Sequence, residues 1–267
     1  MEWVQFARVD HVPRAGEIVH AHETWEEAGG GGAVAAVQLR RLAGEALFIT
    51  ALGDDALGRR AHEDLAGHGV RMEAAWRAAP QRRAFTFLDA GTERTITVMG
   101  ERLAPSGEDR LDWEALDGVD AVYFTAGDPP ALRAARAARV LVATPRARET
   151  IAAAGVALDA LVLSGRDPDE AYRPGEFEPP PRLVVTTLGA HGGRWESAEG
   201  DTGEFAAAPL PGPVVDAYGA GDCFAAGLTY GLGAGMELSA ALDLGGRCGA
   251  ACLAGRGPYG NQLSDPT

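Results

Sequence analysis

The chain has 267 residues, of which 46% are hydrophobic, and its 38 acidic and 24 basic side chains give a formal charge of −14. This composition supports a large buried core and disfavours a nucleic-acid partner, because such a surface repels a phosphate backbone. All 24 basic residues are arginines, which excludes mechanisms that need a lysine amine, such as a Schiff base or a Walker A loop.

No stretch of the sequence reaches the roughly 20 apolar residues of a membrane helix, and its first residues lack the layout of a signal peptide. We therefore expect no membrane partner and a cytoplasmic location. The three cysteines form no CxxC pair, so neither a disulfide framework nor a zinc site is favoured. Cys248 and Cys252, four residues apart on an expected helix, are predicted to be buried.

Short apolar runs of strand length recur along the chain, at 46–50, 121–124, 140–143, 161–163 and 183–187. Segments rich in Ala and Leu, with helical spacing, lie between the runs, at 33–43, 56–68, 130–139 and 147–155. Strands that alternate with helices indicate a mostly parallel sheet covered by helices on both faces. The sequence therefore predicts an α/β core of three layers.

Residues 14–27 and 82–99 break this alternation, because both show apolar residues at every second position. The second segment has a probable turn at Ala90 and Gly91. Each segment is too short to be stable alone, so we interpret them as one small β-sheet lid built from two excursions out of the core. The expected lid comprises 12–28 and 82–99, and the expected core comprises 1–11, 29–81 and 100–267.

The segment 214–228 reads Val-Val-Asp-Ala-Tyr-Gly-Ala-Gly-Asp-Cys-Phe-Ala-Ala-Gly-Leu. Its small residues at 219–221 permit a tight turn that presents consecutive N–H groups at a helix start, a geometry that attracts anions such as a transferring phosphoryl group. Asp222 lies where a carboxylate reaches a hydroxyl beside that anion and takes its proton. On these grounds alone, a helix cap is an equally good interpretation of Asp222.

This segment closely resembles the signature Asp-Thr-x-Gly-Ala-Gly-Asp-x-Phe of the ribokinase-like (PfkB) kinases. The resemblance implies that Asp222 is the catalytic base and that the amides of Gly219, Ala220 and Gly221, with that of Asp222, form an anion hole. Ala217 occupies the place of a frequent threonine, so a hydroxyl that assists nucleotide or ion binding in relatives is missing.

Four glycines at 29–32 lead into a segment rich in Ala and Leu. Glycine permits a close approach of a ligand to backbone amides. The pattern Gly30-x-Gly32-x-x-Ala35 also fits the dinucleotide fingerprint of Rossmann dehydrogenases. That fingerprint follows a buried apolar strand, whereas charged residues precede these glycines, so a dehydrogenase is disfavoured. A flexible linker is a further alternative.

The glycine run resembles the other PfkB signature, a Gly-Gly turn that meets the sugar. The flanking residues 9–17 and 48–58 are similar to the family's first-strand exit and to its Gly-x-Asp-x-x-Gly stretch. The resemblance implies that Asp10, Gly29 and Gly30 contact the acceptor.

Two observations limit this assignment. Val34 stands where ribokinase has a sugar-binding asparagine, which argues against ribose as the substrate. From the residues alone, Asp10 is equally well a turn residue before Pro13.

The strand expected at 183–187 leads into Thr-Leu-Gly-Ala-His-Gly. This run resembles the Thr-Leu-Gly-x-x-Gly stretch that lies along the ATP phosphates and ribose in PfkB kinases. The resemblance implies that Thr187, Gly189 and Gly192 bind the nucleotide. An ordinary hairpin is the alternative.

Ser164 and Asp167 follow the strand expected at 161–163, where relatives usually carry Asn-x-x-Glu. The resemblance implies that both contribute to the nucleotide site, with a water-mediated Mg²⁺ contact for Asp167. The alternative for Asp167 is the cap of a helix that starts at Pro168.

Residues 253–260 resemble the loop that holds a monovalent cation such as K⁺ in many relatives. The first aspartate of the catalytic signature is a ligand of that cation, so the resemblance implies the same role for Asp216. An aspartate that only braces the loop is the alternative.

The resemblance spans nearly the whole chain and predicts a ribokinase-like fold with a small β lid. It implies transfer of the γ-phosphoryl group of MgATP to a sugar hydroxyl. A nucleoside or phosphosugar kinase, and a kinase-like binding protein without activity, remain alternatives. The resemblance to this family also implies a homodimer formed through the lid sheets.

Overall fold

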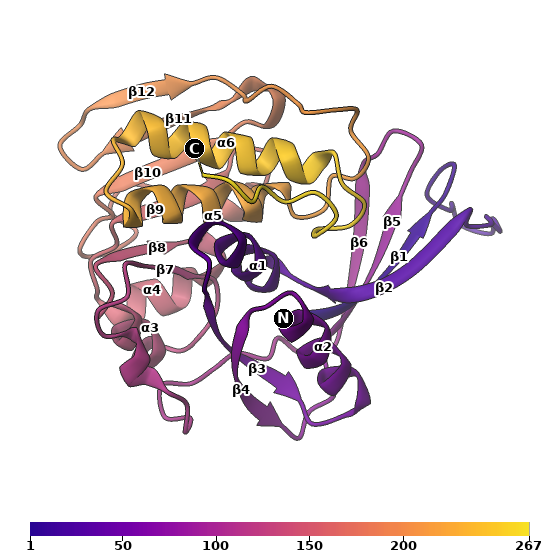
Figure 1. Ribbon diagram of the computed structural model, residues 1–267, viewed down its shortest axis with the longest axis horizontal. Helices are drawn as coiled ribbons and strands as arrows, with labels where there is room; N and C mark the ends of the chain where they lie inside the picture. The colour runs from indigo at the N-terminus through magenta and orange to yellow at the C-terminus, as the bar shows by residue number, and fades with distance from the viewer. Residues whose placement is uncertain (267) are drawn as a thin grey trace.

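The strands of the protein form three sheets in a computed structural model that describes residues 1–266 (Figure 1). The core sheet has six strands in the order β12-β11-β10-β9-β8-β7. Strands β7 to β10 are parallel, and β11 and β12 extend the sheet in antiparallel fashion. Their bounds are β7 Ala121–Phe124, β8 Val140–Ala143, β9 Ala160–Ser164, β10 Leu183–Thr187, β11 Gly193–Ser197 and β12 Thr202–Phe205. The strands predicted at 121–124, 140–143, 161–163 and 183–187 are confirmed.

Helices cover both faces of the core sheet (Figure 1). Alternate residues of a strand point to opposite faces, and in β8 Leu141 packs in the cluster with α3 and α4 whereas Val142 packs in the cluster with α5 and α6. Both residues are fully buried, as in a strand covered on its two faces. The helices are α1 Gly31–Ala43, α2 Ala56–Gly67, α3 Pro129–Ala135, α4 Arg148–Ala154, α5 Ala220–Gly233 and α6 Leu238–Leu253.

Helices α5 and α6 pack closely because small residues line their contact. A Cβ atom at Gly227 would lie 2.9 Å from the Cα of Gly245, so no larger residue fits without a shift of the backbone. All three cysteines are buried, which confirms the prediction for Cys248 and Cys252. Within residues 1–266, no helix is both long enough and apolar enough to cross a membrane.

A second sheet, the lid sheet, has the order β2-β1-β5-β6 and projects from the core (Figure 1). Its strands are β1 Glu2–Arg8, β2 Glu23–Gly29, β5 Arg83–Leu88 and β6 Arg94–Met99. The turn between β5 and β6 is held by Asp89, whose Oδ1 accepts a hydrogen bond from Gly91 N. The sequence assigns residues 1–11 to the core, but β1 runs through the middle of this sheet, antiparallel to β2 and parallel to β5.

The third sheet consists of the parallel strands β3 Leu47–Gly53 and β4 Arg71–Arg77. The buried side chain of Gln81 ties this sheet to the lid sheet, because its Oε1 accepts from Gly53 N at 3.0 Å and its Nε2 donates to Met1 O at 3.2 Å. Asp55 caps α2 by accepting from Gly58 N and also accepts from Gln81 N. The Gly-x-Asp-x-x-Gly stretch therefore fixes the carboxyl end of β3.

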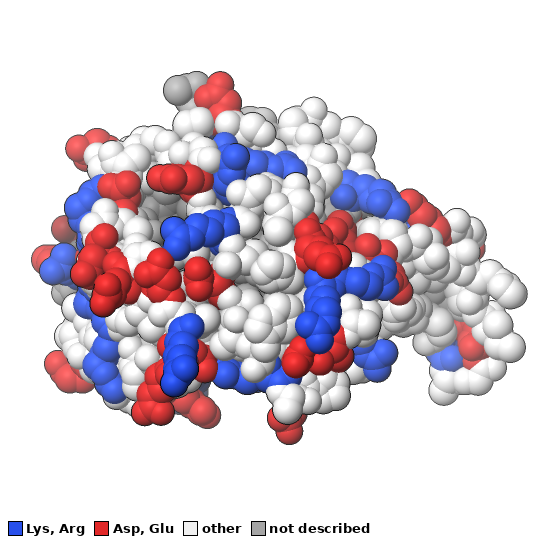
Figure 2. Space-filling model, turned by 60° about the horizontal axis from the view of Figure 1, so that its bottom comes forward, with Lys and Arg blue, Asp and Glu red and all other residues white. Residues whose placement is uncertain are grey.

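Short 3₁₀ helices complete the fold: η1 Trp113–Leu116, η2 Pro145–Ala147, η3 Pro168–Glu170 and η4 Gly189–His191. Acidic and basic side chains are interspersed over the face of the molecule that Figure 2 shows. Many charged side chains of the protein are paired, as in the contacts Arg59–Asp54 at 2.6 Å and Arg71–Asp112 at 2.7 Å. Exposed pairs of this kind add little to stability.

Candidate active site

Asp222 lies in the first turn of α5, directly after the small residues predicted to form an anion site. Gly219 caps the helix with φ 84°, a left-handed conformation that favours glycine. The 14-residue helix therefore begins with free N–H groups and the positive end of its dipole at 219–222.

The glycine run at 29–32, here called the glycine turn, meets this helix start. A Cβ atom at Gly31 would lie 2.5 Å from Asp222 Oδ1, so only glycine permits the observed contact. Gly30 N donates a hydrogen bond of 2.9 Å to the hydroxyl of the buried Tyr218. The structure thus brings together two motifs that are nearly 190 residues apart in the sequence.

The carboxylate of Asp222 is partly exposed, and within residues 1–266 it accepts no hydrogen bond. Burial raises its pKa to about 6, against the opposing influence of Arg94 and Arg146. Glu170 and Glu2 add to the rise. A carboxyl group with this pKa is ionised at neutral pH but still basic enough to accept a proton from an alcohol during phosphoryl transfer.

Asp216 is fully buried behind the helix start. Its Oδ1 accepts from Tyr218 N at 2.8 Å and its Oδ2 accepts from Gly257 N at 3.0 Å. Burial nevertheless raises its pKa. Asp216 therefore braces the loop before α5 against the loop 253–260, as one of the two sequence interpretations expects.

The predicted nucleotide residues gather at the carboxyl ends of two neighbouring parallel strands. Thr187 ends β10 and Ser164 ends β9, and the two are direct partners in the register. Gly189 and Gly192 lie in the turn that follows β10, where η4 is located. A Cβ atom at Gly189 would lie 2.8 Å from the Cζ atom of Arg166, so this guanidinium covers the turn.

Asp167 is paired with Arg146 at 2.7 Å, and its Oδ1 accepts from Asp169 N. It thus caps η3, as the alternative interpretation of this residue expects. The sequence analysis missed Glu170, which is buried and accepts from Ser164 N at 2.7 Å while pairing with Arg146 at 2.6 Å. The only signal for Glu170 in the sequence is its position, since it is an acidic residue a few positions after a buried strand.

At this position Asp167 offers a carboxylate oxygen, and oxygen is the type of ligand that Mg²⁺ prefers. Within residues 1–266 there is no group of three or more His, Cys, Asp or Glu side chains that would hold a metal by themselves. Mg²⁺ in phosphoryl-transfer sites is bound by one or two carboxylates together with substrate phosphates and water, so the residues present fit a magnesium ion that arrives with its nucleotide.

The structure does not bring Asp10 to the glycine turn. Asp10 lies beyond the far end of β1, is exposed, and contacts His22 at 2.9 Å. At about 3.3 Å per residue along a strand, this end, at Arg8, is roughly 20 Å from Glu2. The carboxylate at the glycine turn belongs instead to Glu2, since a Cβ atom at Gly30 would lie 3.5 Å from its Cγ.

Arginine side chains surround the same region. Arg94, at the start of β6, donates to Ala217 O at 2.9 Å and so links the lid sheet to the loop before α5. Arg102 donates to Thr125 O and Arg146 O. No carboxylate pairs with Arg102 among residues 1–266, and burial, with Arg82 and Arg146 nearby, lowers its pKa.

A carboxylate without a hydrogen-bond partner within residues 1–266, a helix start and a glycine turn thus lie together on the α/β core. The sequence matches the pfkB family of carbohydrate kinases over residues 4–171 and 176–264. The chain therefore belongs to the pfkB family and is an ATP-dependent carbohydrate kinase.

Individual relatives agree with this assignment. The chain is 27% identical over 266 residues to the ATP-dependent ribose-1-phosphate kinase of Halopiger xanaduensis, covering 94% of this chain and 88% of the relative. The crystal structure of adenosine kinase from Sinorhizobium meliloti superimposes with a TM-score of 0.78 at 20% identity, covering 96% and 92% of the two chains. Ribokinase from Cryptococcus neoformans in complex with ADP gives 0.72 at 23% identity, with the same coverage. At these identities the structural likeness establishes the ribokinase-like fold.

The bond between Gly30 and Tyr218 generates a prediction. In Tyr218→Phe the part-buried Gly30 N–H loses its acceptor, which costs about 1 kcal/mol of unfolding free energy and loosens the glycine turn against α5. We expect KM for the acceptor to rise more than KM for ATP, measured in a coupled ADP-release assay.

Tyr230→Phe, in α5 and half-buried, is the matched control because no hydrogen bond links Tyr230 to the glycine turn within residues 1–266. An unchanged acceptor KM in Tyr218→Phe would show that the hydroxyl does not position the turn.

Proposed function

We propose that Asp222 is the catalytic base, and that the acceptor hydroxyl lies between its carboxylate and the amides of 219–222. The oxygen of the alcohol attacks the γ-phosphorus of ATP, the bond from this phosphorus to the β–γ bridging oxygen breaks, and ADP leaves. The proton of the alcohol passes to Asp222. The observation that carries the proposal is that this carboxylate has no hydrogen-bond or ion-pair partner among residues 1–266 and lies against Gly31 at the start of α5.

The amides of Gly219, Ala220, Gly221 and Asp222 are proposed to stabilise the transferring phosphoryl group. In the transition state the negative charge is spread over its three equatorial oxygens, so donors fixed in advance around them lower the barrier. The dipole of α5 acts in the same direction.

Acceptor binding is proposed for Gly29, Gly30 and Glu2. Gly30 is partly exposed, and the Glu2 carboxylate beside it provides an acceptor for sugar hydroxyls, whereas Gly29 is buried against Val4 and Tyr218. Glu2 takes the place that the sequence analysis gave to Asp10, which lies at the other end of β1. Val34 is fully buried and packs against Gly219, since a Cβ atom at Gly219 would lie 2.9 Å from Val34 Cγ1, so position 34 offers no polar group to the acceptor.

The nucleotide is proposed to lie along Thr187, Gly189 and Gly192, with Ser164 and Asp167 at its phosphate end. When bound, Mg²⁺ neutralises charge on the phosphates, and Asp167 is its proposed water-mediated ligand. Asp216, braced against 253–260, is the proposed ligand of a monovalent cation such as K⁺.

The lid sheet is proposed to close over the acceptor. Residues 94, 96 and 98 of β6 share one face of the sheet, and Arg94 on that face reaches Ala217. The exposed Ile96 and Val98 therefore lie on the side of the active site. Apolar cover there excludes water that would otherwise hydrolyse ATP.

Replacement of the proposed base gives the most direct prediction of this mechanism. Asp222→Asn should reduce kcat by about 10²- to 10⁴-fold while nucleotide binding, followed by calorimetry, persists. In the native enzyme, kcat/KM should fall tenfold per pH unit below about pH 6, because the base is then protonated.

The stability of the same variant provides a control. The folded-state pKa of Asp222 is raised, so the charged form is disfavoured on folding and stability decreases as the pH rises from about 4 to 6. Asp222→Asn should therefore be at least as stable as the native protein at pH 7 in urea denaturation. The exposed Asp54→Asn should leave activity unchanged. Native kcat in Asp222→Asn would refute the base assignment.

A phosphosugar acceptor is the second candidate, because Arg94 and Arg146 place positive charge near Asp222, Arg102 donates to Arg146 O, and the Halopiger relative is a ribose-1-phosphate kinase. A phosphate on the acceptor would bind these guanidinium groups through charge-assisted hydrogen bonds.

We expect Arg102→Gln to lower kcat/KM by about 10- to 100-fold for a phosphosugar and to have little effect for the unphosphorylated sugar. Arg83→Gln, an exposed arginine at the start of β5, should change neither. Equal losses for both acceptors would show that Arg102 acts only through its bonds to Thr125 O and Arg146 O.

A homodimer formed through the lid sheets is also proposed. β6 is an edge strand of the lid sheet with residues 94–98 exposed, so its backbone is available to a second strand. Light scattering should give twice the 27.8 kDa of the chain. A mass of 27.8 kDa at every concentration would contradict this proposal.

A further inference from the structure

Arg146 carries a guanidinium group that is held along one edge only. It lies in η2, directly after the carboxyl end of β8, and its side chain is 57% exposed. Glu170 Oε1 lies 2.6 Å from its Nε, and Asp167 Oδ2 lies 2.7 Å from its Nη2. The remaining nitrogen, Nη1, makes no hydrogen bond within residues 1–266. The group is therefore fixed by two carboxylates and open to a ligand at its other edge.

These contacts place Arg146 at the phosphate end of the proposed nucleotide site. Glu170 also accepts a hydrogen bond from Ser164 N at 2.7 Å. Ser164 ends β9 and is the register partner of Thr187, which ends β10. Arg146 is thus tied to the strand ends along which the nucleotide is proposed to lie.

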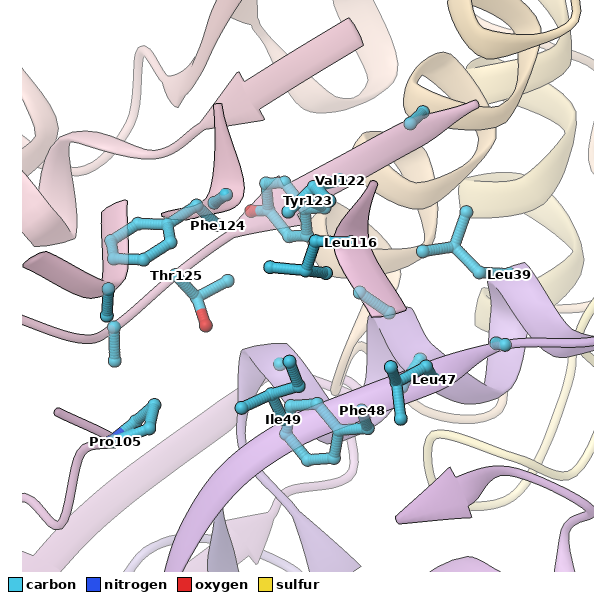
Figure 3. A pocket seen from close by; sticks show the side chains of 18 of the residues that line it. Leu39, Leu47, Phe48, Ile49, Pro105, Leu116, Val122, Tyr123, Phe124 and Thr125 are labelled. Atoms are coloured by element: carbon cyan, nitrogen blue, oxygen red, sulfur yellow. The ribbon is translucent and has the colours of Figure 1, made fainter. Parts of the chain in front are cut away.

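A second arginine ties Arg146 to the acceptor half of the site. Arg102 donates from Nη1 to Arg146 O at 3.0 Å and from Nη2 to Thr125 O at 2.8 Å. Thr125 lines the cavity shown in Figure 3. It is next to the glycine turn, because a Cβ atom at Gly32 would lie 3.0 Å from Thr125 Oγ1. One guanidinium group therefore joins the backbone of Arg146 to a direct neighbour of the glycine turn.

The electrostatics of the site agree with this geometry. Burial raises the pKa of Asp222, and the charges of Arg94 and Arg146 oppose the rise. Burial also raises the pKa of Tyr123, on whose hydroxyl the charges of Asp222 and Arg146 both act. Coulomb interactions weaken with distance, so Arg146 lies close to the carboxylate of Asp222. Its open edge is therefore near the space between the proposed base and the nucleotide.

A fixed cation has a chemical use at this place. During transfer the γ-phosphoryl group moves from the nucleotide towards the acceptor hydroxyl, and negative charge is spread over its three equatorial oxygens. A guanidinium group binds phosphate oxygens through charge-assisted hydrogen bonds and stays charged at every physiological pH. The chain contains no lysine, so arginine is its only source of a permanently charged side-chain cation.

We propose that Arg146 is a catalytic residue that donates from Nη1 to a non-bridging oxygen of the γ-phosphoryl group during its transfer. The inference rests on the proposed function. Arg146 forms no covalent bond and keeps its proton. The acceptor oxygen bonds to phosphorus, the bond from phosphorus to the β–γ bridging oxygen breaks, and the proton of the alcohol passes to Asp222. Glu170 and Asp167 hold the opposite edge of the guanidinium group.

A purely structural role of Arg146 is the alternative that the test must separate. Glu170 is buried, and a buried carboxylate that loses its cation is destabilising. Arg146→Gln alone therefore lowers stability under both interpretations. The double variant Arg146→Gln/Glu170→Gln removes both charges, and the new amide at position 170 still accepts from Ser164 N. A structural role predicts that this double variant recovers activity together with stability.

The test compares the native protein, Arg146→Gln and the double variant, with the best acceptor of a panel that includes ribose and ribose 1-phosphate. We expect Arg146→Gln to lower Tm by about 5 °C and the double variant to recover most of this loss. kcat should fall by about 10²- to 10³-fold in both variants. In calorimetry the double variant should bind ATP about tenfold more weakly, and ADP should change by less than about twofold.

Arg136→Gln is the matched control. Arg136 pairs with Asp159 at 2.6 Å, and Asp159 precedes the amino end of β9, at the opposite edge of the core sheet from Arg146. This variant should lose stability and keep the native kcat. Recovery of native kcat in the double variant would overturn the proposal, as would equal weakening of ATP and ADP binding. A native protein that neither binds ATP nor releases ADP would instead refute the proposed function.

Discussion

The contact between the glycine turn at 29–32 and the start of α5 is the constraint on which the site depends. Gly30 N–H donates to the Tyr218 hydroxyl, and Gly31 lies so close to Asp222 that a side chain at that position would collide with its carboxylate. One contact thus fixes the acceptor surface, the anion-binding helix start and the carboxylate relative to one another. Asp216 holds the same loop from behind through Tyr218 N and Gly257 N.

The electrostatic character of the site follows from this packing. The carboxylate of Asp222 is removed from much of the solvent without receiving a hydrogen bond among the described residues, so its pKa rises to about 6, while Arg94 and Arg146 limit the rise. Arg94 comes from the lid sheet and contacts Ala217 O. A movement of the lid would therefore change both the access of water and the charge around Asp222, which couples acceptor binding to the chemistry.

Features that depend on neighbouring residues were predictable from the sequence. The strands of the core sheet follow from apolar runs, and the helix start at Asp222 follows from small residues before an apolar helix. Features that depend on pairing between distant segments could not be predicted from the sequence. The register of β1 against β2 decides which carboxylate lies at the glycine turn, and it pairs Glu2, not Asp10, with Gly29. Glu170 and Arg146 meet across two strand ends.

A crystal structure with a non-hydrolysable ATP analogue and a sugar acceptor tests the central claim most directly. The account predicts the terminal phosphate at the amides of 219–222 and one acceptor hydroxyl within hydrogen-bonding distance of Asp222, with the rest of the acceptor on Gly29 and Gly30. An acceptor bound away from the glycine turn, or a terminal phosphate remote from the start of α5, would contradict it.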